Sequence, residues 1–404
     1  MWHAINSILD SYLYGTEMVS DEIENVLVLQ GGGSLGAFGC GVFKAFANNN
    51  IKIHIAAGTS IGGINAAIIA GSRDRPEKSL ENFWLELAKN SVDLIPEFLH
   101  RAIDLTENYY SKRQEIVGAN ESLKHMLSYY SSATYGNSRM FLPRWRPEYA
   151  ISDPEYFMPQ NWTYIYDHSP LAKTLEKYID YNKLRPGGNP NVRLVVTAVN
   201  VLTAEPMIFD SSQSQITVKH LLASSGYPLY SFPWVEVEHG VYAWDGSLLS
   251  NTPLREVMDV APVRDKRVFI VENYPKKIDR LPKNMPEVYH RARDIMFSDK
   301  TAHNVRMSRV ITHYLQFIQE LYQLVEKHVD KSEIDKNKLA CIKKKYKKII
   351  EEHGSEIKTV EYITREERFP YLYENTDFTH EGISQLIDEG QSTTEKILRR
   401  NGLI

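Results

Sequence analysis

The sequence predicts an α/β protein with a mostly parallel central sheet covered by helices on both faces. Short runs of apolar, β-branched residues recur along the chain, each with the length of a strand. The first two runs are each followed by a segment with helical periodicity. Strands that are apolar along their whole length and separated by helices are typical of a parallel sheet buried on both faces.

Strands and helices alternate in the predicted order. The first strand is Val26–Leu29, and a helix over Ala37–Asn48 follows it after a run of glycines. The second strand is Ile51–Gly58, with a helix directly after it. Two later apolar runs, Val192–Val201 and Arg267–Asn273, predict further strands of the same sheet.

The chain changes character after Pro282, where helical periodicity dominates. Amphipathic spacing predicts a long helix over Met296–Asp330, a basic helix over 336–353 and another helix over Asp377–Arg400. The basic helix contains the run Lys343–Lys348, which we interpret as a solvated helix face, with contact to anionic headgroups as the alternative.

These patterns divide the chain into three regions. An N-terminal helical segment at 1–24 is expected to pack on the rest, with a membrane-surface helix as the alternative. The α/β domain is assigned to 25–285 and a helical C-terminal region to 286–404. Within the α/β domain, an insertion at 129–166 stands apart by its composition.

Composition excludes several classes of protein. The chain has 404 residues with 47 basic and 51 acidic side chains, so no global basic field indicates nucleic acid. The two cysteines, Cys40 and Cys341, do not make a disulfide framework and favour a reducing, cytoplasmic location. The N-terminus lacks the basic head and apolar core of a secretory signal, and the most apolar window is too polar for a bilayer span.

The insertion 129–166 is dense in Tyr, Trp, Phe and Pro. So many aromatic residues argue against disorder, and long irregular insertions are often lids or binding loops. We therefore expect Trp145 and Trp162 to control access for an apolar substrate, with a packed cover as the alternative.

The glycine run after the first strand allows two interpretations. Gly31, Gly33 and Gly36 satisfy the G-x-G-x-x-G pattern of dinucleotide-binding folds. That pattern also needs an acidic residue about 20 positions later, at the end of the next strand, to bind the ribose. The strand "IKIHIAAG" has no carboxylate, so the dinucleotide interpretation fails its second requirement.

The segment "GTSIGG" after the second strand instead predicts a nucleophilic serine. Gly58, Ser60 and Gly62 form G-x-S-x-G between a predicted strand and a predicted helix, which is the context of a nucleophile elbow. The helix N-terminus then favours the negative charge that develops at the hydroxyl. The alternative is a serine that only caps the helix.

A serine nucleophile needs an oxyanion hole and a base. The main-chain amides of Gly32, Gly33 and Ser34 open a helix and form a donor nest for an oxyanion. No histidine among the 13 has a distinctive context, whereas Asp245 follows a predicted strand and precedes a glycine. The alternative for Asp245 is an ordinary Asp–Gly turn.

In combination, four ordered motifs resemble the patatin-like phospholipase family. They are "GGGSLG", "GTSIGG", "ASSGYPLYSFP" and "DGSLLSNTP", and the resemblance covers about Asn25 to Pro275. It implies a three-layer α/β/α sandwich that hydrolyses acyl esters of phospholipids, lysophospholipids or neutral lipids. The sequence contains neither H-E-x-x-H nor an Asp-rich calcium loop, so we expect no metal and no cofactor. Carried over to this sequence, Ser60 is the nucleophile and Asp245 its base, and the oxyanion loop consists of Gly31, Gly32, Gly33 and Ser34.

The sequence departs from the family pattern at two positions. Leu35 stands where the family usually has Arg or Lys, so the loop itself carries no cation, and Ser247 stands where Gly or Ala is common. Two alternatives follow: an esterase acting on another hydrophobic ester or a storage polyester, and a non-catalytic interaction protein on the same scaffold. The expected partners are a lipid or other hydrophobic ester and, transiently, a membrane surface.

Overall fold

The computed structural model describes residues 23–91, 127–188, 192–260, 264–298, 301–328, 336–353, 356–367 and 374–404. Among these residues, an eight-stranded sheet has the order β10-β9-β1-β2-β5-β8-β7, with β6 also paired to β5. The N-terminal helix expected at 1–24 falls almost wholly outside the described residues.

The strands that the sequence predicts form the parallel half of this sheet. β1 (Glu24–Leu29) lies between β2 (Ile55–Thr59) and β9 (Lys266–Glu272), and β2 continues to β5 (Arg193–Asn200), all in parallel. The other half is antiparallel and consists of β6 (Pro206–Asp210), β7 (Val235–Glu238) and β8 (Val241–Asp245). The sheet is therefore mostly parallel where it holds the motifs.

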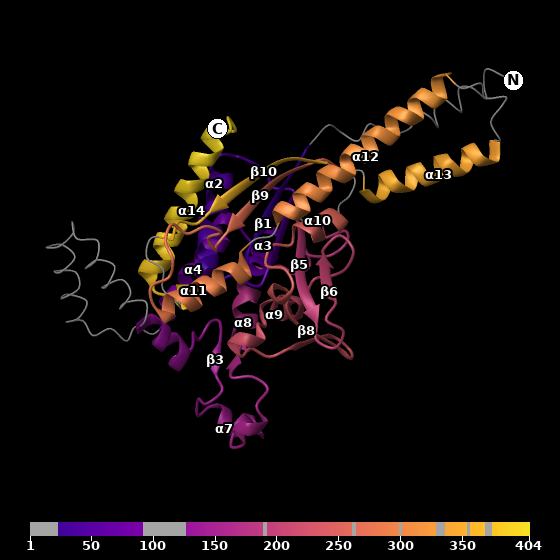
Figure 1. Ribbon diagram of the computed structural model, residues 1–404. Helices are drawn as coiled ribbons and strands as arrows, with labels where there is room; N and C mark the ends of the chain where they lie inside the picture. Colours follow the sequence, from indigo (N-terminus) through magenta and orange to yellow (C-terminus); the bar gives the residue numbers. More distant parts are fainter. Residues whose placement is uncertain are drawn as a thin grey trace.

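Helices cover both faces of the sheet, which confirms the three-layer arrangement (Figure 1). Leu27 and Leu29 of β1 pack against one helical layer, and the alternate residues Val26 and Val28 pack against the other. This alternation explains why β1 is apolar throughout. The first layer contains α2 (Gly36–Asn48), α3 (Ile61–Gly71), α4 (Pro76–Lys89), α8 (Ser169–Tyr178) and α9 (Val218–Ser225); the second contains α10 (Leu254–Val260) and α12 (Thr301–His328).

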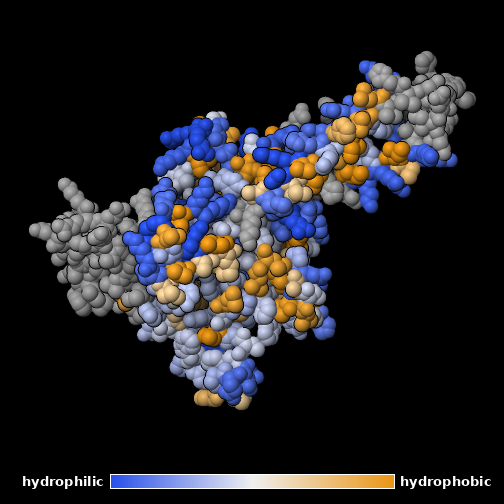
Figure 2. Space-filling model, viewed as in Figure 1, coloured by the Kyte–Doolittle hydropathy of each residue, from blue (hydrophilic) through white to orange (hydrophobic). Residues whose placement is uncertain are grey.

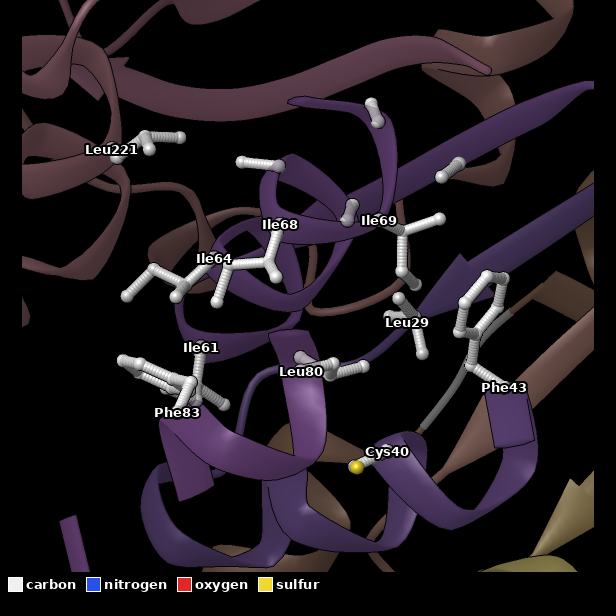
Figure 3. Packing of buried hydrophobic residues seen from close by; sticks show 14 of the residues in the cluster. Leu29, Cys40, Phe43, Ile61, Ile64, Ile68, Ile69, Leu80, Phe83 and Leu221 are labelled. Atoms are coloured by element: carbon white, nitrogen blue, oxygen red, sulfur yellow. The ribbon is translucent and has the colours of Figure 1, made fainter. Parts of the chain in front are cut away.

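The helix that follows the G-x-S-x-G motif is at the centre of the core. Every residue of α3 is buried. Its isoleucines, including Ile61, Ile64 and Ile68, pack among side chains of the neighbouring strand and helices (Figure 3). A fully buried α3 gives its first residue and the preceding turn a rigid support.

The C-terminal region contains α11 (Met285–Phe297), α12, α13 (Lys336–His353) and α14 (His380–Arg400). The α12 and α13 helices run side by side and project away from the sheet, whereas α14 lies along α2 (Figure 1). A Cβ atom on Gly390 would lie 2.1 Å from the main-chain oxygen of Phe38, so these two backbones are in direct contact. The C-terminal region is thus partly an integral layer of the α/β domain.

The strand β10 (Ile357–Thr364) lies within this region and was not predicted from the sequence. β10 pairs in parallel with β9 at the edge of the central sheet. It includes the exposed Lys358 and Thr359 between buried isoleucines, because an edge strand has only partial cover. This mixed pattern lacks the apolar run by which the buried strands were recognised.

The insertion 129–166 is an ordered excursion that ends in α7 (Tyr149–Ser152), far from the sheet (Figure 1). Residues 127–135 are helical, and β3 (Leu142–Pro143) pairs with β4 (Tyr166–Asp167) at its base. The guanidinium of Arg144 lies over the rings of Trp162 and Tyr164, at 5.0 and 4.6 Å from their centroids. No helix in the described ranges has the length and apolar character needed to cross a membrane.

Candidate active site

Ser60 stands at the sharp turn between β2 and α3. Its backbone has φ 58° and ψ −132°, a conformation that non-glycine residues rarely adopt and that is frequent at functional sites. Its N–H donates a hydrogen bond to Ser224 Oγ (3.0 Å), and its carbonyl accepts one from the Ile64 N–H (3.1 Å). These two bonds hold the turn at both ends of the residue.

The glycines on either side of Ser60 are required by close backbone approach. A Cβ atom on Gly58 would lie 2.2 Å from the carbonyl carbon of Gly62. A Cβ atom on Gly62 would lie 2.2 Å from the main-chain oxygen of Leu29. Ser60 occupies the N-cap position of α3, but its side chain makes no capping hydrogen bond. The hydroxyl is therefore available for another partner.

Asp245, at the end of β8, lines the same cavity wall as Ser60. The Ser60 side chain lies close enough to the Asp245 carboxylate to lower its pKa, and Ser247 N–H donates a hydrogen bond to Oδ1 (2.8 Å). Asp245 is 1% exposed, and this burial raises its pKa from 3.8 to about 6, against the opposing effect of Ser60 and Ser247. The Asp–Gly turn that the sequence allowed is present, and it also places Asp245 in the cavity wall with Ser60.

The glycine loop between β1 and α2 lies beside Ser60. Gly32 and Gly33 have φ values of 152° and 57°, which favour glycine. Gly31 N–H donates to Asn251 Oδ1 (3.0 Å), so the Gly31 amide is already engaged. No residue in the described part of the chain accepts a hydrogen bond from the N–H of Gly32, Gly33 or Ser34.

Gly31 has a different role from the two glycines that follow it. A Cβ atom there would lie 2.6 Å from Asn251 Oδ1 and 3.0 Å from the Ser60 Cβ atom. Gly31 therefore allows the loop to approach the serine closely and is not itself a free donor. The sequence pattern alone gave no means of separating this role from that of Gly32 and Gly33.

A cavity of about 650 Å³ opens directly over Ser60 and Asp245. Its wall is mainly apolar, and it is formed by the glycine loop, the insertion, the segment after α9 and the C-terminal region. Side chains that line it remain exposed at its mouth, among them Leu229, Tyr289 and Met296. On this side of the molecule, hydrophobic side chains are gathered between α11 and β8 (Figure 2).

A comparison with family models tests which protein family these motifs belong to. The model described as "Patatin-like phospholipase" matches residues 27–258, which include Ser60, Asp245 and the glycine loop. This chain belongs to the patatin-like phospholipase family. The resemblance seen in the sequence is confirmed, and the protein is a lipid acyl hydrolase.

Two solved structures are similar to this patatin-like chain. VipD from Legionella pneumophila is 16% identical, with a TM-score of 0.39, over 94% of this chain and 67% of VipD. ExoU of the type III secretion system of Pseudomonas aeruginosa, solved with SpcU, is 16% identical, with a TM-score of 0.25, over 66% of this chain and 47% of that one. A search of the curated proteins finds no match.

Trp145 and Trp162, which the sequence predicts to control access, do not line the cavity over Ser60. Its lining from the insertion includes Phe141 and Tyr166 instead. Trp145 contacts the ring of Tyr166, with centroids 5.9 Å apart, and so lies one layer behind the wall. Trp162 packs under Arg144 and donates its indole N–H to the Glu155 main-chain oxygen (2.9 Å).

His168 lines the cavity over Ser60, although the sequence pattern did not identify it as a candidate. His168 is buried, and its Nε2 lies 3.1 Å from the main-chain oxygen of Leu222. Burial lowers the pKa of His168, against the opposing hydrogen bond to Leu222. His220 instead caps α9 through Thr217, and His239 is exposed. The groups that shift the pKa of Asp245, besides its burial, are Ser60 and Ser247 and include no histidine.

A group of potential metal ligands lies in the C-terminal region, outside the lining of the cavity over Ser60. Within the described ranges, the ligand atoms of His290, Asp294, Glu367 and Glu374 all lie within 4.8 Å of one another. Arg293 forms ion pairs with Asp294 and Glu374, and Arg365 pairs with Glu367 and Glu374. Because these arginines already neutralise the carboxylates, we interpret the group as an ion-pair network.

Proposed function

We propose that the protein hydrolyses carboxylic esters of lipids, as a phospholipase A or lysophospholipase does, by covalent catalysis with Ser60 and Asp245. The observation that carries this proposal is a serine in a strained backbone conformation beside a buried carboxylate, both in the wall of a largely apolar cavity. A serine that served only as a helix cap would have its hydroxyl directed at the main-chain N–H groups of α3.

The first half of the reaction forms an acyl-enzyme. Ser60 Oγ attacks the ester carbonyl carbon, and its proton passes to Asp245. The oxygen of the tetrahedral intermediate accepts hydrogen bonds from the amides of Gly32, Gly33 and Ser34, and one such donor typically contributes about 3 kcal/mol to the transition state. The C–O bond to the leaving group then breaks, and the leaving oxygen takes the proton from Asp245 as the alcohol departs.

The second half releases the fatty acid. Asp245 takes a proton from water as the water oxygen attacks the acyl carbon, and the same amides stabilise the second oxyanion. Collapse of this intermediate breaks the bond to Ser60 Oγ, which regains the proton. A pKa of about 6 makes Asp245 a stronger base than an exposed aspartate and leaves it mainly ionised at pH 7.

The apolar surroundings favour a lipid as the source of the ester. Exposed apolar side chains at the cavity mouth, such as Leu229 at 69% exposure, are suited to contact with a lipid surface. We therefore expect contact with a membrane or lipid aggregate during turnover, through the rim of the cavity. Acyl chains would occupy the space between the insertion and the C-terminal region.

The test combines an ester panel with a covalent probe. Wild-type protein and Ser60→Ala are assayed on short nitrophenyl esters, phospholipid and lysophospholipid vesicles, and polyester particles. We expect lipid hydrolysis by the wild type only, and labelling by a fluorophosphonate probe that disappears in Ser60→Ala. Ser212→Ala is the matched control, because Ser212 lies outside the cavity lining. Turnover by folded Ser60→Ala, or activity on polyester alone, would contradict the proposal.

A further inference from the structure

The glycine loop is supported from behind by a segment that lies outside the family match. This segment is η5, Glu374–Thr376, in the C-terminal region. Ser34 Oγ donates a hydrogen bond to the main-chain oxygen of Glu374 (2.9 Å). A Cβ atom on Gly33 would lie only 2.2 Å from the main-chain oxygen of Asn375. The loop therefore rests directly on η5.

The position of η5 is itself determined by two buried arginines. Arg293 and Arg365 donate hydrogen bonds to Glu374 Oε1 at 2.9 and 2.8 Å, and the three side chains are at most 7% exposed. Although burial opposes ionisation, the guanidinium groups hold the pKa of Glu374 below its ordinary value. A buried carboxylate with two cationic donors has little freedom to move, since breaking either pair leaves a charge without compensation.

The same arginines also connect to the other end of the loop. Arg365 Nε donates to the main-chain oxygen of Asn273 (3.0 Å), and Asn273 Nδ2 donates to the main-chain oxygen of Gly31 (3.1 Å). Arg293 donates to Asn375 Oδ1 (3.4 Å) and lies over the ring of Tyr274, 5.2 Å from its centroid. The loop is thus held at its first glycine and again at its helical end.

This support is relevant to catalysis because donors stabilise an oxyanion effectively only when they are already oriented. We propose that Arg293, Arg365 and Glu374 are positioning residues that keep the amides of the glycine loop directed at the reacting oxygen. The proposal rests on the proposed function, since it presupposes that this loop binds the oxyanion. It also assigns a role to the C-terminal region: α11 brings Arg293 to a loop in which Leu35 provides no charge.

The mildest test removes the hydrogen bond between the loop and η5. Ser34→Ala deletes the donor to Glu374, and Ser128→Ala is the matched control. Ser128 Oγ also makes a buried 2.9 Å hydrogen bond to the C-terminal region, at Asp377, but does not contact the loop. We expect kcat on a soluble ester to fall about 3- to 10-fold in Ser34→Ala, as for one lost hydrogen bond, with KM nearly unchanged. Ser128→Ala should keep wild-type kcat.

Inhibition by a trifluoromethyl ketone distinguishes a positioning role from a purely structural one, because a loss of stability alone would not change the inhibition constant. Ser60 Oγ adds to its carbonyl carbon, the hydroxyl proton passes to Asp245, and the resulting oxyanion occupies the position of the tetrahedral intermediate. If the loop amides are misplaced, the inhibition constant should rise by the same factor by which kcat/KM falls. A lower melting temperature with unchanged kcat and inhibition constant would overturn the proposal.

Glu374→Gln tests the charge of the network and retains the shape of the side chain. We expect a loss in kcat of about 10²-fold, comparable to losing one oxyanion donor. Arg293→Lys, which keeps the positive charge, should retain more activity than Arg293→Met. If Glu374→Gln does not fold, Ser34→Ala decides alone. If Ser34→Ala keeps the wild-type kcat and inhibition constant while Ser60→Ala is inactive, this inference is refuted and the proposed function stands. An active Ser60→Ala would instead refute the proposed function.

Discussion

Gly33 and Asn375 are in contact across 342 positions of the sequence, so closely that a Cβ atom on Gly33 would lie 2.2 Å from the Asn375 main-chain oxygen. Gly33 also has φ 57°, a left-handed conformation in which side chains are strained. Both constraints act on a residue that lines the cavity above Ser60.

Gly33→Ala should therefore lower kcat by about 10²-fold, because the added methyl group displaces the loop amides from the oxyanion position. The matched control is Gly187→Ala, since Gly187 has φ 73° and no atom within 4 Å of its added Cβ. That variant should keep full activity and lose about 1 kcal/mol of stability from backbone strain alone. Equal activity of the two variants, measured on the folded proteins, would contradict the oxyanion role of Gly33.

Asp245→Asn should abolish turnover and at the same time stabilise the fold above pH 6. The amide cannot act as a base, whereas it removes a charge that is unfavourable in the buried site. The rise in pKa from 3.8 to about 6 means that the folded state binds the proton more tightly than the unfolded state. This contribution to stability is complete below pH 3.8 and is lost as pH rises to about 6, at a cost of about 3 kcal/mol.

The measurement is urea unfolding of both proteins at pH 5 and pH 8. The stabilisation of Asp245→Asn relative to wild type should be larger at pH 8. A variant that is less stable than wild type at pH 8 would argue that the Asp245 carboxylate is favoured in its site.

The rate of acylation should depend on the ionisation of Asp245. Because only the carboxylate accepts the Ser60 proton, the rate should fall as pH drops through about 6. The rate of fluorophosphonate labelling, followed from pH 4.5 to 8.5, reports this step without substrate ionisation. A midpoint near pH 4 in the labelling rate would mean that burial does not raise the pKa of Asp245, which would contradict this prediction.

No histidine should be essential for hydrolysis. His168 is the decisive position, because it is the histidine that lines the cavity among the described residues. His168→Gln should retain most of kcat, as should His220→Gln and His239→Gln, whose side chains do not line the cavity. Loss of a histidine base would lower kcat by about 10²-fold or more, and such a loss in folded His168→Gln would replace the dyad by a triad.

The insertion should affect large substrates more than small ones. Trp145 supports Tyr166 in the cavity wall, so Trp145→Ala should reduce hydrolysis of lipid vesicles more than that of a short nitrophenyl ester. Trp162→Ala is the control, since its ring packs on Arg144 behind the wall. If Trp145→Ala loses the same fraction of activity on both substrates, the insertion is a structural cover and this prediction is wrong.

Much of the scaffold around Ser60 follows from local sequence. The strand before it, the glycines at 58 and 62 and the helix after it are contiguous, so their apolar pattern and steric needs are visible within about 20 residues. The same holds for the glycine loop after β1 and for Asp245 at the end of β8. The family membership rests on these short segments, and the boundaries of α13 agree with the pattern that predicted it.

The sequence by itself thus determined the α/β class, the family and a short set of candidate residues. The tertiary structure alone decided which of them meet: that Ser60 and Asp245 line one cavity, that the Gly31 amide is occupied by Asn251, and that Glu374 supports the loop. β10 and the network around Arg293 were missed for the same reason. Periodicity and turn chemistry act over a few residues, whereas burial, ion pairing and a shifted pKa depend on neighbours that are hundreds of positions away in the chain.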